Sequence, residues 1–135
     1  MADVRVVTVL ASETSCDRVG DLPGACRISP TEVMLLGDVS IDVLERAVRA
    51  EDPDAVLLDV SNGWALVPLD GARAREAFAR LSELRLPVEG FVQGEVARIG
   101  ARVLVRRDGI HLLVPAMLEA HVRARVAFDC RGLLP

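Results

Sequence analysis

The chain has 135 residues, a net charge of −4, 51% hydrophobic residues and 27% charged residues. This length suits a single domain with a genuine core, and the composition excludes both a disordered chain and a disulfide-dense scaffold. The acidic balance and the aromatic content of only 3% argue against a nucleic-acid-binding surface. Apolar runs are too short to cross a membrane, and the first residues do not resemble a secretory signal, so we expect a cytoplasmic protein.

The first half of the chain predicts three strands, a loop and a helix. β-Branched and apolar residues predict strands over residues 4–10, 25–28 and 32–36. The polar segment of residues 12–23 is expected to be a loop. From Ser40, a suitable N-cap, the spacing of apolar residues becomes helical and predicts a helix over residues 40–50.

The middle of the chain predicts a hairpin followed by a helix. Apolar runs over residues 55–60 and 65–69 flank Asn62-Gly63, a dipeptide that favours tight hairpin turns. The next helix is expected over residues 71–84. Its apolar stripe is Ala74, Ala77, Phe78, Leu81 and Leu84.

The last third predicts a strand over residues 94–99, a hairpin over residues 101–114 and a final helix that Pro115 opens. Asp108-Gly109 is a preferred type I′ turn and gives the hairpin a register. In that register Val105 lies opposite Leu112, Val103 lies opposite Val114, and all four share one face. These elements predict a single α+β domain over residues 1–135, with an antiparallel or mixed sheet and two or three packed helices.

Motifs for catalysis are missing from the sequence. There is no glycine-rich phosphate loop and no nucleophile elbow, so we expect no catalytic residue and hold an independent enzyme to be the least favoured class. The three cysteines have no metal-binding spacing, and only two histidines could complete a zinc site, so we expect reduced thiols and no metal. These residues are Cys16, Cys26, Cys130, His111 and His121.

One turn concentrates polar groups next to the only tryptophan. Asp59, Ser61 and Asn62 follow an apolar strand, where they can stabilise an Asx-type turn or contribute to a binding site. Trp64 follows directly, and it is suited equally to the core, to stacking on a heterocycle and to anchoring a protein interface.

Several segments together resemble a known family. These are the sequences Ile28-Ser-Pro-Thr-Glu-Val-Met-Leu-Leu-Gly37, Leu58-Asp-Val-Ser-Asn-Gly-Trp-Ala65, Leu69-Asp-Gly-Ala-Arg-Ala-Arg-Glu76 and Gly94-Glu-Val-Ala-Arg98, with the hairpin from Val103 to Val114 and its helix. In order and spacing they resemble the gamma subunit of heterotetrameric sarcosine oxidase over about residues 26–128. The first 25 residues do not match that family's opening segment, and the chain is shorter than the usual gamma subunit.

This resemblance implies both a fold and a role. The gamma subunit is similar to the first, folate-binding domain of the aminomethyltransferase of glycine cleavage, and to the N-terminal domain of a tRNA-modifying GTPase. It has no established catalytic residue, and the cofactors of the oxidase are held by other subunits. Where the aminomethyltransferase has a catalytic aspartate, this chain has Arg85, which argues against aminomethyl transfer.

Two functions follow from the resemblance. The first is a non-catalytic accessory subunit that binds no cofactor itself and docks onto a larger flavin-dependent amine-oxidising complex. The second is a stand-alone homo-oligomeric module that binds tetrahydrofolate. In the second, the candidate ligand residues are Asp59, Trp64, Glu95 and Arg98. An acidic side chain would accept hydrogen bonds from the pterin and the arginine would bind the glutamate tail.

Overall fold

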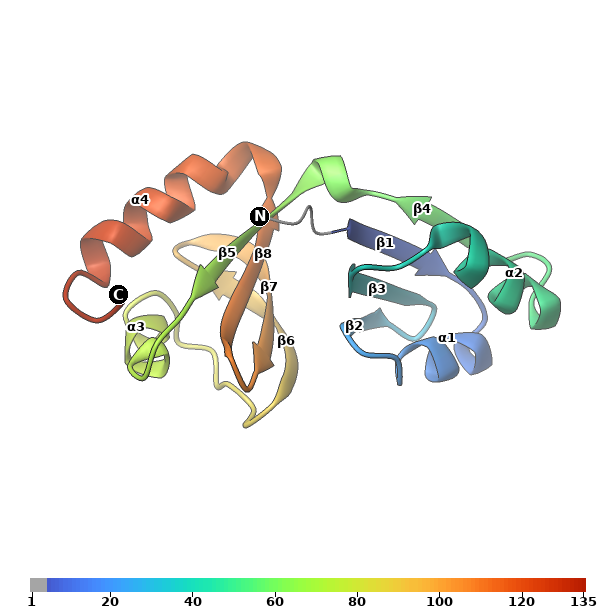
Figure 1. Cartoon of the computed structure of the whole chain (residues 1–135), viewed down its shortest axis with the longest axis horizontal. Coiled ribbons are helices and arrows are strands. Elements are labelled where there is room, and N and C mark those ends of the chain that lie inside the picture. The colour runs from blue at the N-terminus through green and yellow to red at the C-terminus, as the bar shows by residue number, and fades with distance from the viewer. Residues whose placement is uncertain (1–4) are drawn as a thin grey trace. The chain divides into compact units, whose positions relative to one another are not determined.

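The computed structural model describes residues 5–135, and the chain divides into two compact units, Met1–Ser61 and Asn62–Pro135. Each unit contains one four-stranded antiparallel sheet with helices beside it (Figure 1). The predicted α+β class is confirmed, and of the two predicted sheet types the antiparallel one is observed. The single domain over residues 1–135 stays a prediction.

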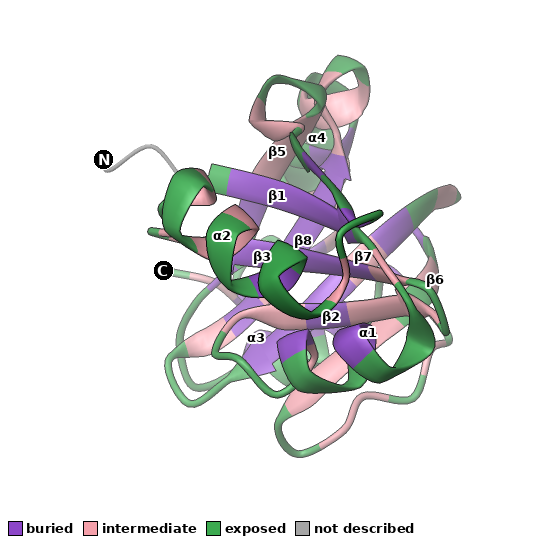
Figure 2. Ribbon diagram, turned by 90° about the vertical axis from the view of Figure 1, so that its right-hand side faces the viewer, coloured by how far each residue is buried: buried purple, intermediate pink, exposed green. Residues whose placement is uncertain are grey.

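The first unit orders its strands β2-β3-β1-β4. The elements are β1 (Arg5–Leu10), α1 (Glu13–Val19), β2 (Ala25–Ser29), β3 (Glu32–Gly37), α2 (Ile41–Glu51) and β4 (Val56–Asp59). Strands β1 and β3 pair so that Val7 lies opposite Leu35 and Val9 opposite Val33. These residues form one core with Cys16 and Val19 of α1 and Val48 of α2. Figure 2 shows the buried strands behind the two helices, whose outer sides are exposed.

The second unit orders its strands β5-β8-β7-β6. Its elements are η1 (Ser61–Gly63), which joins the two units, β5 (Trp64–Leu69), α3 (Ala74–Ala79), β6 (Gly90–Val96), β7 (Ile99–Arg106), β8 (Gly109–Pro115), η2 (Ala116–Leu118) and α4 (Glu119–Asp129). The core gathers the inward residues of the sheet against Phe78 of α3 and Val122 of α4. Alternation along β7 and β8 therefore places one face of each strand in the core.

The predicted loop over residues 12–23 is wrong, because it contains helix α1. Ser12 caps this helix by accepting a hydrogen bond from the backbone N–H of Ser15 at 3.2 Å. The helix is only seven residues long, and it buries Cys16 and Val19 against the sheet. With α1, the described residues contain four α-helices, one more than the upper end of the prediction.

The predicted hairpin around Asn62-Gly63 is also wrong. Strand β4 pairs with β1, whereas β5 pairs with β8 in the other sheet. Neither Asn62 nor Gly63 has the positive φ that a type I′ turn needs, and the segment forms a 3₁₀ turn instead. The dipeptide therefore connects the two units and does not join paired strands.

The single strand expected over residues 94–99 is wrong, because the β6–β7 turn divides this range between two paired strands. Other boundaries also differ. The helix expected over residues 71–84 is observed only over Ala74–Ala79, as α3. Leu81 and Leu84 still contact the core, from the loop that follows α3. The hairpin of β7 and β8 is confirmed, but Val103 lies opposite Leu112 and Val105 opposite Ile110. This register is shifted by two residues from the predicted one. Because the side-chain period of a strand is two, the four core valine and leucine residues keep their face.

The two units have opposite charges. The first contains twelve acidic residues and five arginines, a net charge of −7. The second contains eight acidic residues and eleven arginines, a net charge of +3. The overall charge of −4 therefore does not show that the second unit is basic. The charge of the whole chain is a poor guide to whether this unit binds anions.

All three cysteines are buried, and none of them forms a disulfide in the part of the chain that the structure describes. Cys16 and Cys26 belong to the first unit, and Cys130 follows α4 in the second. Burial raises the pKa of the Cys16 thiol and of the Cys130 thiol above the ordinary value. Both side chains therefore stay protonated and unreactive at neutral pH in the folded chain.

Candidate functional site

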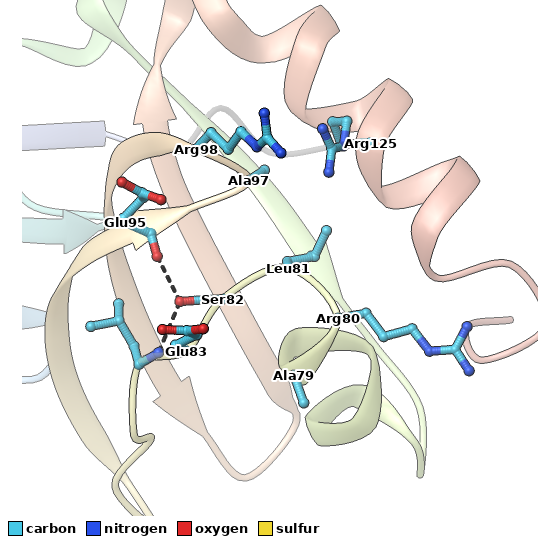
Figure 3. A pocket seen from close by; sticks show the side chains of 10 residues that line it. Ala79, Arg80, Leu81, Ser82, Glu83, Glu95, Ala97, Arg98 and Arg125 are labelled. Carbon is cyan, nitrogen blue, oxygen red and sulfur yellow. Dashed lines mark hydrogen bonds between the residues drawn. The ribbon is translucent and has the colours of Figure 1, made fainter.

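The second unit has an open cavity of about 700 Å³ between the loop after α3, the β6–β7 turn and the side of α4. Its polar lining residues are Arg80, Ser82, Glu83, Glu95, Arg98 and Arg125, and Figure 3 shows how they lie. Leu81 and Ala97 add an apolar part to the lining. The volume is in the range of sites for small organic molecules.

The β6–β7 turn that borders the cavity has an unusual backbone. Val96 pairs with Ile99, so Ala97 and Arg98 are the two turn residues, and both have positive φ values, 51° and 69°. Tight hairpin turns of this kind favour Asn-Gly, because glycine has no Cβ and asparagine adopts the left-handed region more readily than other residues with a side chain. Two such residues in succession cost about 1–3 kcal/mol each, which the surrounding structure must offset.

Contacts of Ala97 hold this turn in place. Its backbone N–H donates to the carbonyl oxygen of Leu81 at 2.8 Å. Its own carbonyl oxygen lies 3.4 Å from Nε2 of His121 on α4. Ala97 is buried while Arg98 is exposed. The turn therefore fixes its first residue in the core and presents the second to the cavity.

The three arginines of the cavity differ in their partners. Arg125 donates from Nε to the carboxylate of Asp129 at 2.9 Å, which fixes its side chain along α4. Arg80 donates to the carbonyl oxygen of Asp129 at 3.2 Å. Within residues 5–135 the guanidinium of Arg98 has no hydrogen bond or ion pair. In Figure 3 the side chain of Arg98 extends toward α4, where Arg125 lies.

The opposite wall of the cavity is acidic and its backbone is fixed. The hydroxyl of Ser82 donates to the carbonyl oxygen of Glu95 at 2.6 Å and accepts from the N–H of Leu84 at 3.1 Å. The side chains of Glu83 and Glu95 are exposed at this wall. The cavity thus offers cationic donors on one side and carboxylate acceptors on the other.

Of the four residues predicted to bind a ligand, the structure brings two together. Glu95 and Arg98 line the same cavity. Trp64 lies in a separate open hollow of about 400 Å³, where the guanidinium carbon of Arg102 is 4.4 Å from the centre of its ring. This distance is that of a cation–π contact. Asp59 belongs to the first unit.

Asp59 forms the polar turn that the sequence indicated. Its Oδ1 accepts from the hydroxyl of Ser61 at 2.6 Å and from the backbone N–H of Ser61 at 3.0 Å. The Ser61 hydroxyl oxygen in turn accepts from the N–H of Val6 at 2.8 Å, so the turn is tied to strand β1. The hydroxyl bond and then the backbone bond hold the pKa of Asp59 below its ordinary value, with a smaller effect from Arg5.

The depressed pKa of Asp59 predicts a pH-dependent stability. A carboxyl whose pKa is lowered on folding stabilises the folded state above its unfolded pKa, and that contribution disappears as pH falls through the folded value. We expect Asp59→Asn, which resembles the protonated state, to melt below wild type at pH 7, and the difference to become smaller at about pH 3. Circular dichroism melts would show this; an equal gap at both pH values would contradict it. Asp38→Asn, at an exposed position, is the control.

Sequence reasoning missed part of the cavity. Arg80, Ser82 and Arg125 were not singled out, because they come from two distant segments and share no motif spacing. The only sequence signal is that Arg125 follows Val122 by three residues, which places it beside the buried stripe of the last helix.

Within residues 5–135 no three His, Cys, Asp or Glu side chains are grouped closely enough to hold a metal ion. None of the described helices has the length and apolar character needed to span a bilayer.

These features define an α+β protein with two antiparallel sheets and an arginine-lined cavity. The chain is similar in fold to a chain of the heterotetrameric sarcosine oxidase from Corynebacterium sp. U-96, whose structure contains pyrrole 2-carboxylate. The TM-score is 0.75 at 14% sequence identity, and the likeness covers 93% of this chain and 78% of the other. The resemblance found in the sequence is therefore confirmed at the level of the fold, over more than residues 26–128.

No protein-family model matches the chain, and no curated protein matches it significantly.

Proposed function

We propose that the chain is a non-catalytic accessory subunit, similar to the gamma subunit of sarcosine oxidase, that docks onto a larger flavin-dependent amine-oxidising complex. The observation that supports this most is the fold likeness to a heterotetrameric sarcosine oxidase chain over 93% of this one. The cavity adds to it, because it has neither a nucleophile next to a base nor a metal-binding group of residues among those described.

Helix α4 offers a surface for such docking. Its inner side buries Val122 and packs Val126 against the core of the second unit. Its outer side carries Met117, just before the helix, and Phe128, which are 88% and 68% exposed. Ala120 and Ala124 lie between them at helical spacing and are also exposed. We call Met117, Ala120, Ala124 and Phe128 the outer stripe.

The outer stripe suits an apolar ridge of a partner. Large apolar side chains exposed together mark interaction sites, and small residues between them let another helix approach closely. Arg123 and Arg125 flank the stripe, and Arg131 lies over the Phe128 ring at 4.7 Å. In a unit with a net charge of +3, this arrangement favours a partner whose docking segment is acidic around its apolar residues.

Co-expression tests the proposal. The chain would be produced with the alpha, beta and delta subunits of a sarcosine oxidase encoded in the same genome. We expect it to co-purify with them in equimolar amount, in a complex far larger than the chain's own 14.5 kDa. Elution of the chain alone at that mass, beside a complete oxidase of the other subunits, would contradict the proposal.

Tetrahydrofolate binding by a homo-oligomer is the second candidate. The observation that favours it is that Glu95 and Arg98 line one cavity of about 700 Å³. A carboxylate can accept hydrogen bonds from a pterin ring, and an arginine can pair with a glutamate tail. Trp64 and Asp59 do not line this cavity, so any contact of theirs with the folate would have to be made elsewhere.

Calorimetry of the isolated chain with tetrahydrofolate tests the second candidate. Saturable binding that Arg98→Gln weakens would support it. The absence of heat at ligand concentrations of about 1 mM would contradict it.

A further inference from the structure

The arrangement of arginines in the cavity of the second unit points to a ligand more general than a folate. Arg98 is the one lining arginine that the described residues leave without a hydrogen bond or ion pair. Its neighbour across the cavity, Arg125, is already oriented by Asp129 at 2.9 Å. Arg98 extends toward Arg125 (Figure 3), so one available and one fixed guanidinium form a fork that can hold an oxyanion between them.

The backbone supports this interpretation independently. Arg98 occupies a left-handed turn position with a φ of 69°, where glycine would be unstrained. The preceding Ala97 has a φ of 51° and is locked by its bond to Leu81. Strained backbone conformations of this kind are frequent at ligand sites, because they hold a side chain in a position that an unstrained turn would not give.

The charge balance selects among anions. Three arginines and two glutamates line the cavity, and Asp129 pairs with Arg125 beside it, so the charges of this set balance. A phosphate would add two negative charges near Glu83 and Glu95, whereas a carboxylate would add one and is repelled less. Leu81 and Ala97 supply contacts for an apolar body behind the carboxylate.

We propose that this cavity binds a small carboxylate-bearing molecule, with Arg98 and Arg125 holding its carboxylate. The site is complete within the isolated chain, so ligand binding requires neither the proposed partner subunits nor a pterin. Arg98 makes the new charge-assisted hydrogen bonds, and Arg125 provides a fixed second donor.

Benzoate and benzamide are matched probes, since they have nearly the same shape and differ in charge. In nitrogen-15-labelled chain, the Nε–H signals of the arginines would be followed during titration with each. We expect benzoate to shift the signals of Arg98 and Arg125 saturably, with a dissociation constant on the order of 1 mM. Benzamide should bind at least about tenfold more weakly.

Variants separate binding from folding. Arg98→Gly removes the guanidinium and relieves the left-handed strain, so it should melt at or above the wild-type temperature while benzoate binding falls by about tenfold or more. Arg125→Gln should lower the affinity similarly. Arg107→Gln changes an exposed arginine outside the cavity and should bind as wild type does.

Three results would overturn the proposal. The first is equal shifts with benzoate and benzamide, which would show that the cavity does not distinguish a carboxylate from a neutral amide. The second is unchanged benzoate binding by Arg98→Gly. The third is saturable binding of inorganic phosphate that is tighter than that of benzoate, which would assign the fork to phosphate instead.

Discussion

Gly109→Ala is expected to destabilise the second unit by about 2–5 kcal/mol, because two separate costs add. Gly109 has a φ of 150°, a conformation that residues with a side chain rarely adopt. A Cβ there would also lie 2.9 Å from the carbonyl oxygen of Leu69 and 3.2 Å from Oδ1 of Asp70. Since the first of these atoms is backbone, strand β5 would have to move away from the hairpin.

Urea unfolding followed by tryptophan fluorescence measures this loss, because Trp64 lies in the same unit. Gly100→Ala is the matched control: it adds the same methyl group to β7, where no atom lies within 4 Å. That variant should change stability by less than about 1 kcal/mol, and toward greater stability. Equal effects of the two substitutions would show that the backbone at Gly109 relaxes freely.

The double variant Met117→Ser, Phe128→Ser is expected to weaken association with the oxidase subunits by at least about a hundredfold, or roughly 2.7 kcal/mol. The two side chains are the large apolar members of the outer stripe and bury little in the free chain. The isolated variant should therefore melt close to wild type. Biolayer interferometry against the assembled partner subunits would measure the affinity, and melting curves would measure the stability.

Val88→Ser is the control for this double variant. Val88 is also an exposed apolar residue of the second unit, but it lies in the loop before β6, away from α4 in the sequence and in the fold. It should bind as wild type does. If the double variant also binds normally, docking uses another surface, and the proposed accessory role is then judged by the co-expression experiment alone.

Turn dipeptides show where sequence reasoning succeeded and where it failed. Asp108-Gly109 correctly predicted the hairpin of β7 and β8, yet only Gly109 has a positive φ and the register differs by two residues. Asn62-Gly63 predicted a hairpin that does not exist, because the strands on its two sides join different sheets. The turn with two left-handed residues is Ala97-Arg98, which no composition rule would select.

The reason is that a turn's conformation is decided partly by what its flanking strands pair with. At residues 97 and 98 the pairing of β6 with β7 and the bond from Ala97 to Leu81 impose the left-handed backbone on unfavourable residues. At residues 62 and 63 no such pairing exists, so favourable residues adopt another conformation. Local preference is a weak constraint compared with tertiary contacts at such positions.

Periodicity gave the bounds of one helix closely but overran another, since α3 covers only Ala74–Ala79 of the expected residues 71–84. The stripe of α2 gave its bounds to within one residue. Helix α1 was missed because it is short and its buried residues, Ser15, Cys16 and Val19, include only two apolar ones, too few for a period to be visible. In the candidate site, Glu95 and Arg98 were named from the sequence, whereas Arg125 joins the site only because α4 lies next to the β6–β7 turn.

The buried thiols give each unit its own chemical reporter of opening. Cys16 stands in the core of the first unit and Cys130 in that of the second, and a protected thiol reacts with an alkylating reagent only when its surroundings open. The labelling rates of these two residues in increasing urea therefore report two local stabilities in one experiment. Coincident rates would mean that the units open together as one cooperative domain, and separate rates would mean that they open independently.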